Sequence, residues 1–170
     1  ICLPLCMGIK NRAEGTAAAM VSPYLWTDNG QLTEEGTETV WDRSTLYGFK
    51  GAFIAGTGDK VIDYFREYSA RRLTGEHVPY ASEAYPEGNR RHLSGESALY
   101  CRIVTDGIFG ISPRGLHSFT LTPRLDGFDH VYLRNIHAFG VIFDLMTDKT
   151  GCHVVIAGKE AAFAPLGCET

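Results

Sequence analysis

The stretch that decides the fold runs from Gly75 to Arg124 and reads GEHVPYASEAYPEGNRRHLSGESALYCRIVTDGIFGISPRGLHSFTLTPR. It places a loop rich in carboxylates and aromatic residues before an apolar segment of helical length, and an alternating strand pattern follows. Loops held between rigid elements concentrate binding and catalytic groups. The polar and aromatic side chains of this loop are Tyr80, Glu83, Tyr85, Glu87, Asn89, Arg90, Arg91 and His92. Aromatic faces, planar polar groups and carboxylates are what recognition and cleavage of a carbohydrate require.

Before and after this loop, apolar residues recur at helical spacing and predict three helices, over about 41–55, 59–73 and 94–109. The first two are expected to form an antiparallel hairpin. Asp59 is a candidate N-cap for the second helix, and the pair Arg71-Arg72 suits the negative end of its dipole. The stretch up to about Trp26 is also expected to be helical.

After Gly115 the apolar residues alternate with period two, and polar turns interrupt them. This pattern predicts antiparallel strands over residues 115–160. The sequence therefore indicates a mainly α protein with a C-terminal β region. We expect one domain over residues 1–113 and a second over residues 114–170.

The order of motifs around the central loop resembles the six-hairpin glycosidases, which share an (α/α)6 barrel and include glucoamylase-like, α-rhamnosidase-like and cellobiose-phosphorylase-like enzymes. The first match is YASEAY at 80–85, followed by HLS at 92–94 and ESALY at 96–100. In the glucoamylase-like branch, a Tyr-Ala-Glu-Gln-Phe stretch carries the general base, and a short polar loop leads to a helix that opens Leu-Ser.

The second match lies downstream, in FGISP at 109–113, GLH at 115–117 and LTPRL at 121–125. It resembles the Leu-Gly-Ile-Arg-Pro helix end and the Gly-Leu-x-Ile-x-Pro-x-Leu-Pro strand of the phosphorylase-like branch. The resemblance covers roughly residues 40 to 145. Three departures leave the subfamily open: Ser82 is an extra residue, Tyr100 replaces a Trp, and Asp126 stands where Pro is common.

The resemblance implies the last helical hairpins of an (α/α)6 barrel, followed by a small antiparallel β-sandwich-like segment. Such a barrel needs twelve helices, so we expect a fragment whose N-terminal barrel helices are missing. The resemblance also implies a glycoside hydrolase, bacterial in style, that inverts the configuration with Glu83 as general base. The general acid would lie upstream of Ile1. An inverting enzyme needs two carboxyl groups about 6.5–9.5 Å apart.

The remaining candidate site residues are expected to bind the sugar: Trp41, Asp42, Arg43, Tyr80, Tyr85, Glu87, Arg91 and His92. Three carboxylates compete with Glu83 for its role, namely Glu76, Glu87 and Glu96. Glu96 is the weakest of them, because the dipole of the following helix explains a glutamate in its first turn. Asp42 and Arg43 could instead form a pair that faces solvent.

Two alternative functions stay open at this point. Arginine forks bind phosphate oxygens bidentately, so Arg90 and Arg91 could mark a glycoside phosphorylase of the same fold. The loop could also belong to a non-catalytic carbohydrate-binding protein with a helical barrel. The sequence names neither the sugar nor the linkage.

Composition argues against several other classes. The net charge is −4 without a basic stripe, so we expect no nucleic-acid partner. No apolar run approaches the roughly 20 residues that cross a bilayer, so no membrane contact is expected. The five cysteines lack the spacing of a zinc site, and we expect neither a metal nor a cofactor. A periplasmic or secreted parent protein is favoured over a cytoplasmic one.

Overall fold

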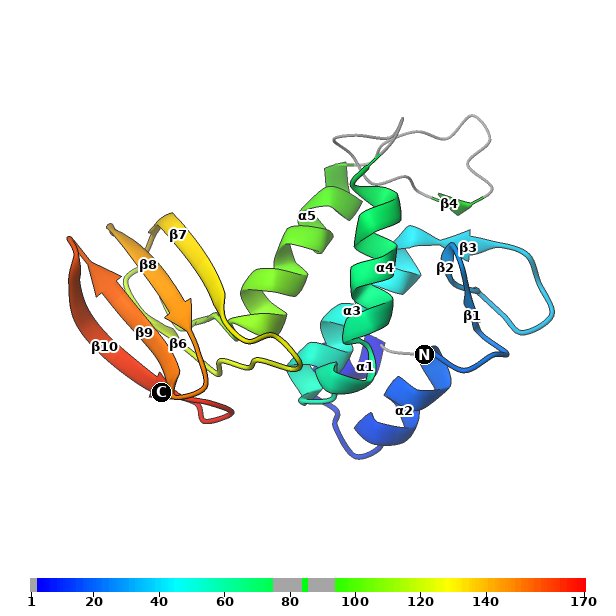
Figure 1. Cartoon of the computed structure of the whole chain (residues 1–170), viewed down its shortest axis with the longest axis horizontal. Coiled ribbons are helices and arrows are strands. Elements are labelled where there is room, and N and C mark those ends of the chain that lie inside the picture. The colour runs from blue at the N-terminus through cyan, green and yellow to red at the C-terminus, as the bar shows by residue number, and fades with distance from the viewer. Residues whose placement is uncertain (1–2, 75–83, 86–93) are drawn as a thin grey trace. The chain divides into compact units, whose positions relative to one another are not determined.

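The computed structural model describes residues 3–74, 84–85 and 94–170 (Figure 1). The chain divides into two compact units, Ile1–Ile103 and Val104–Thr170. The change from helical to period-two spacing in the sequence falls near this division. Each unit has a hydrophobic core of its own.

The first unit combines helices with short strands (Figure 1). Its elements are α1 (Leu3–Cys6), α2 (Ala13–Met20), β1 (Trp26–Thr27), β2 (Gly30–Gln31), β3 (Val40–Trp41), α3 (Asp42–Ala55), the 3-10 helix η1 (Gly58–Lys60), α4 (Ile62–Arg72), β4 (Ala84–Tyr85) and α5 (Ser94–Arg102). The three helices expected from apolar spacing therefore form as α3, α4 and α5. Gly56 ends α3 in the left-handed conformation, with φ of 82°, which costs glycine little.

Aromatic rings fill the core between α3 and α4. The ring of Phe49 lies edge-on to that of Phe65 at 5.2 Å, and Phe53 meets Phe65 at 5.7 Å. Phe49 and Phe53 are four residues apart, so both project from one face of α3. Edge-to-face pairs of this kind are the arrangement that aromatic rings prefer. This packing confirms the predicted contact between the first two helices.

The N-terminal stretch differs from the expected continuous helix. After α2 the chain turns into a hairpin, in which Trp26 pairs with Gln31 and Thr27 with Gly30. The turn residues are Asp28 and Asn29. Gly30 directly follows the turn and has φ of 126°, a backbone angle that glycine adopts readily because it lacks a Cβ atom. Asp59 also differs from expectation, since it lies inside η1 and does not cap α4.

The second unit is a small antiparallel β structure (Figure 1). The π-helical segment η2 (Ile103–Ile108) leads into β5 (Ser112–Pro113), β6 (Phe119–Thr120), β7 (Val131–Ala138), β8 (Val141–Thr147), β9 (Gly151–Ile156) and β10 (Lys159–Pro165). The strands β10, β9, β8 and β7 form one four-stranded sheet in that order, and β5 pairs with β6. Tight turns join the strands, as the alternating pattern predicts.

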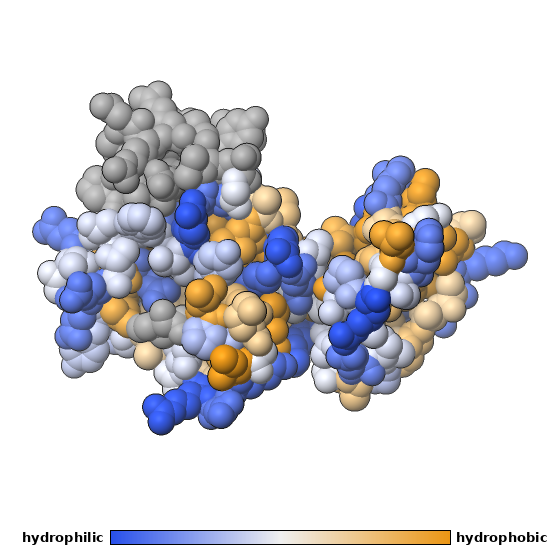
Figure 2. Space-filling model, turned by 180° about the vertical axis from the view of Figure 1, so that it is seen from behind, coloured by the Kyte–Doolittle hydropathy of each residue, from blue (hydrophilic) through white to orange (hydrophobic). Residues whose placement is uncertain are grey.

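One face of this sheet packs on an apolar core. Phe143 and Leu145 on β8 point inward with exposures of 2% and 0%, and the ring of Phe119 stacks on that of Phe143 at 5.2 Å. Gly110 lies where a Cβ atom would come within 2.2 Å of the Thr122 carbonyl oxygen, so only glycine fits there. Apolar side chains also reach the surface of this unit (Figure 2). Ile142, for example, is 54% exposed.

The expected fold class is wrong. The chain is not mainly α, because a four-stranded antiparallel sheet makes up most of the second unit and short strands separate the helices of the first. A partial (α/α)6 barrel requires successive helical hairpins. Here the segments before and after the α3 and α4 pair form the β1–β2 and β3–β4 ladders. Within the described residues, no helix is long and apolar enough to cross a membrane.

Candidate functional site

A hollow of about 330 Å³ lies in the first unit, beside the start of α3. Its lining residues come from α1, from β2 and the residues after it, and from β3 and α3: Leu3, Gln31, Leu32, Thr33, Trp41, Arg43, Ser44 and Tyr47. Two of them are aromatic, three carry hydroxyl groups and one is an arginine. This set offers an apolar face together with hydrogen-bonding groups, which is the composition of a small-molecule site.

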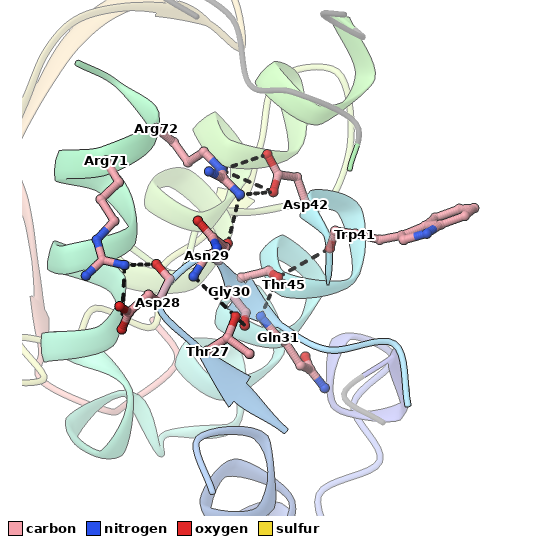
Figure 3. A network of polar contacts seen from close by, with 10 residues as sticks. All are labelled: Thr27, Asp28, Asn29, Gly30, Gln31, Trp41, Asp42, Thr45, Arg71 and Arg72. Carbon is pink, nitrogen blue, oxygen red and sulfur yellow. Dashed lines mark hydrogen bonds and ion pairs between the residues drawn. The ribbon is translucent and has the colours of Figure 1, made fainter. Parts of the chain in front are cut away.

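The chain enters α3 through two neighbouring residues that lie in opposite environments. Trp41 is 37% exposed, whereas Asp42 is completely buried. Figure 3 shows the indole of Trp41 directed away from the carboxylate of Asp42. Trp41 has extended backbone angles and Asp42 begins the helix. This change of backbone conformation turns one side chain to the hollow and the other to the interior.

Asp42 forms a buried ion pair with Arg72 at the end of α4 (Figure 3). Nε of Arg72 donates to both carboxylate oxygens at 3.2 and 3.1 Å, and Nη2 donates to Oδ1 at 3.0 Å. Burial alone would lower the pKa of the Arg72 guanidinium, but the neighbouring Asp42 carboxylate raises it. The pair also suits the helix dipoles, with the anion at the start of α3 and the cation at the end of α4.

The same arginine holds the β1–β2 hairpin. Nη2 of Arg72 donates to the carbonyl of Asn29 at 2.8 Å. On the other side of the hairpin, the backbone N–H of Gln31 donates to the hydroxyl of Thr45 at 2.9 Å. Arg71, which is half exposed, donates to the carbonyl of Asp28. The hairpin that carries part of the hollow is thus fixed to both α3 and α4 (Figure 3).

Arg43 connects the hollow to α5. Its Nε donates to Oε1 of Glu96 at 2.7 Å, and the two side chains are 48% and 1% exposed. The other oxygen of Glu96 is buried and has no hydrogen-bond partner among the residues that the structure describes. A buried carboxylate needs a cationic partner. Glu96 therefore does more than stabilise the helix dipole, which was its expected role.

The predicted loop is tied to the hollow through β4. Val40 pairs with Tyr85 and Trp41 with Ala84 in the β3–β4 ladder, and Ala84 directly follows Glu83 in the sequence. Two segments that are separated by more than forty positions thereby lie side by side. The predicted residues Tyr80, Glu83, Glu87, Arg91 and His92 lie outside the described residues, and so does the side chain of Tyr85.

The candidate site residues that the structure describes lie in different environments. Trp41 and Arg43 line the hollow, whereas Asp42 is buried in its ion pair. Asp42 and Arg43 also do not form the solvent-facing pair that the sequence suggested as an alternative. Asp42 is completely buried, and Arg43 bonds to Glu96. Asp42 thus links α3 to α4 and does not line the hollow.

Several lining residues were missed from sequence, namely Gln31, Thr33, Ser44 and Tyr47. Helical spacing could have identified Ser44 and Tyr47, because they lie three and four positions from other lining residues of α3. Nothing in the sequence pattern connects Gln31 and Thr33 to this site. Among the described residues, no group of three or more His, Cys, Asp or Glu side chains could hold a metal ion.

Comparison with known proteins gives one structural similarity. No family model matches the chain, and no curated protein matches it. Among solved structures the chain is similar to a sialidase, with a TM-score of 0.61 and 16% sequence identity. The match covers 99% of this chain and 20% of the sialidase, so the chain spans about a fifth of that protein's length. At this identity the similarity shows the fold alone, and it is a further finding against the partial barrel.

Proposed function

We propose that this chain is a carbohydrate-contacting part of a glycoside hydrolase and that the hollow beside α3 holds part of the saccharide. The β3–β4 ladder is the observation that carries the proposal. It holds the residue after Glu83 beside Trp41, and Trp41 lines the hollow. The residue that follows the predicted base is therefore paired with a residue that lines the hollow.

The chemistry of the lining supports a sugar ligand. The indole of Trp41 offers an apolar face for the C–H groups of a pyranose ring, and its 37% exposure leaves that face accessible. The hydroxyls of Thr33 and Ser44 can both donate and accept hydrogen bonds, as sugar hydroxyls do. The structural similarity to a sialidase, which is a glycosidase, is consistent with this ligand class.

For catalysis we propose Glu83 as the general base of an inverting hydrolysis. In such a reaction the base takes a proton from water while a second carboxyl group protonates the leaving oxygen. Glu83 directly precedes Ala84 in the sequence, and Ala84 pairs with Trp41, which lines the hollow. The second carboxyl group would come from a part of the protein beyond these residues.

A non-catalytic carbohydrate-binding role is the second candidate, and one observation favours it. The described residues that line the hollow include no carboxylate. Hydrolysis needs two carboxyl groups, whereas binding needs none. The binding proposal and the catalytic proposal therefore require separate experiments.

Binding is tested on the 170-residue chain with neutral oligosaccharides, using cellotetraose, maltotetraose and xylotetraose as probes. The chain contains only two tryptophans, and Trp26 packs against Phe49 and Tyr64. Ligand-dependent fluorescence should therefore come mainly from Trp41. We expect Trp41→Ala to weaken binding by about tenfold, since aromatic contacts contribute about 0.5–1.5 kcal/mol beyond burial; because this variant lacks the fluorescent reporter, its affinity is measured by titration calorimetry.

Tyr24→Ala is the matched control, because Tyr24 is an aromatic residue of the same unit that is 67% exposed and lies outside the hollow. It should leave the affinity unchanged. Equal effects of both substitutions, or no binding of any probe, would contradict the proposed site.

Catalysis is tested with Glu83→Gln in protein that hydrolyses a glycoside and contains this chain. Glutamine retains the size of the side chain but cannot accept the proton, so kcat should fall by about 10²–10⁴-fold while saccharide binding is retained. Glu87→Gln is the control. Loss of turnover in Glu87→Gln alone would assign the base to Glu87, and unchanged turnover in both variants would favour the binding role.

A further inference from the structure

The charge of the hollow is uneven. Among the described residues that line it, Arg43 is the single charged one, and none of the others is acidic or basic. The Arg43 side chain is 48% exposed and forms part of the wall of the hollow. The chain as a whole has a net charge of −4. A cation in this position is therefore a local feature and does not reflect a generally basic surface.

Glu96 keeps that guanidinium in place. The carboxylate lies on α5, is 1% exposed and does not line the hollow. It accepts the Nε–H of Arg43 at 2.7 Å, and its second oxygen is buried without a partner among the described residues. Movement of Arg43 away from Glu96 would leave a buried anion without this cationic partner, which is strongly unfavourable. The guanidinium is thus held by a contact on the side of α5.

An arginine held in this way can recognise an anionic group. Guanidinium groups bind carboxylates in a planar, forked geometry, and hydrogen bonds between charged groups are about twice as strong as neutral ones. Here the arginine lies in the same hollow as the indole of Trp41 and the hydroxyls of Thr33 and Ser44. A ligand that matches all of these groups has a sugar ring and a carboxylate.

We propose that the hollow takes an acidic saccharide, whose carboxylate is bound by Arg43, with Glu96 as a positioning residue. This inference rests on the proposed function and names its substrate class. Hydrogen bonds to charged groups contribute about 1.5–3 kcal/mol, so we expect roughly a ten- to hundredfold preference for the acid over its neutral counterpart.

The preference is measured on the 170-residue chain with pairs of probes that differ only in charge. Trigalacturonic acid is compared with its methyl ester, and 3′-sialyllactose with the methyl ester of its sialic acid carboxyl group. At least one acid should bind about tenfold or more tightly than its counterpart, and about 0.5 M NaCl should reduce that ratio by screening the charges. Equal affinity of acid and counterpart in both pairs would overturn the inference, and so would failure of both acids to bind.

Variants test whether Arg43 and Glu96 cause the preference for the acidic probe. Arg43→Gln combined with Glu96→Gln removes both charges together and retains hydrogen-bonding amides, so the fold should persist, as a thermal melt would show. The acid-to-neutral ratio should fall to about one. Arg43→Lys retains the charge without the fork and should retain part of the preference. An unchanged ratio in the double variant would remove Arg43 from the site.

Glu96 is tested by comparing two substitutions. Glu96→Gln retains an acceptor for the Arg43 Nε–H and should retain the preference for the acid, whereas Glu96→Ala should lower it. A merely structural role would change the affinities for acid and neutral probes equally.

The effect of Trp41→Ala distinguishes a wrong substrate class from a wrong binding site. If Trp41→Ala weakens all probes but no acid is preferred, the saccharide site stands and its acidic class is wrong. If Trp41→Ala has no effect on any probe, the proposed function itself is wrong.

Discussion

The helices and strands of the two units are held together by different interactions. In the first unit, charged side chains link the ends of helices, through Asp42 with Arg72 and Arg43 with Glu96. In the second unit, the strands of one sheet close over an apolar core that includes Phe143 and Leu145. Apolar packing tolerates small changes of shape, whereas a buried ion pair depends on both partners. The candidate site lies in the unit that depends on ion pairs.

The largest expected effect in this comparison comes from Arg72→Ala. Removal of the cation takes the Arg72 partner away from the buried Asp42 carboxylate. Breaking such a pair costs about 3–5 kcal/mol of stability. Chemical denaturation, with amide hydrogen exchange to locate the loss in the first unit, measures the effect. Arg71→Ala is the control, because the neighbouring arginine is half exposed and surface pairs contribute only about 0–1 kcal/mol.

Replacing both Asp42 and Arg72 is a second test of how far the first unit depends on this ion pair. A combined Asp42→Leu and Arg72→Met variant removes both charges and should be much more stable than Arg72→Ala alone, since apolar replacement of a whole buried pair is often neutral. Equal losses in Arg71→Ala and Arg72→Ala would show that the first unit does not depend on the buried pair.

Leu145→Ala should have the next largest effect, in the second unit. Leu145 is fully buried, and truncation to alanine leaves a cavity that costs about 2–5 kcal/mol. Ile142→Ala on the same strand is the control, because Ile142 is 54% exposed on the other side of the period-two pattern. Similar losses from the two substitutions in a denaturation experiment would mean that the sheet is not packed on one face.

High pH should weaken the first unit through Tyr68. Burial, followed by the Asp42 carboxylate, raises the pKa of this phenol above its ordinary value. The folded-state pKa therefore exceeds the unfolded one of about 10, so the contribution to stability is complete below pH 10 and is lost as pH rises. The slope is about 1.4 kcal/mol per pH unit.

The loss of stability at high pH is measured by denaturing the parent chain and Tyr68→Phe between about pH 9 and pH 11. The variant should lose that part of the slope, because phenylalanine has no proton to release. An unchanged slope in the variant would show that Tyr68 does not carry the pH dependence.

The smallest expected effect is a gain. Gly15 lies in the interior of α2, and a Cβ atom added there meets nothing within 4 Å. Gly15→Ala should stabilise the first unit by about 0.5–1 kcal/mol, because alanine loses less backbone freedom on folding. Circular dichroism during thermal unfolding would detect it. A lower melting temperature would show that α2 is held by contacts that the alanine disturbs.

Much of the secondary structure was predictable from sequence, because it depends on local patterns. Spacing along the chain predicted α3, α4 and α5, and alternation predicted the strands from β6 to β9, whereas β5 and most of β10 lie outside the predicted range. The β1–β2 hairpin was missed although Asn29-Gly30 is a turn signal, since strands of two residues are too short to show a period. The assembly of these elements into an (α/α)6 barrel was the error, and it came from the family resemblance.

The candidate site was predictable only in part, for a different reason. Trp41 and Arg43 were predicted to bind the sugar, and they line the hollow. The roles of Asp42 and Glu96 depend on partners 30 and 53 positions away in sequence. A local sequence pattern does not show which residues so far apart in the sequence become partners. Arg71 and Arg72 likewise look alike in sequence, and only the fold separates the exposed arginine from the buried one.

The buried pair of Asp42 and Arg72 also limits how this protein can evolve. Since loss of either charge alone is costly, an intermediate with a single substitution would fold poorly and would be removed by selection. Positions 42 and 72 should therefore change together among descendants of a common ancestor, either by exchanging the signs of the charges or by becoming apolar at once. Because Arg72 also holds the hairpin at Asn29, the backbone at that turn should vary less in length than an ordinary surface loop.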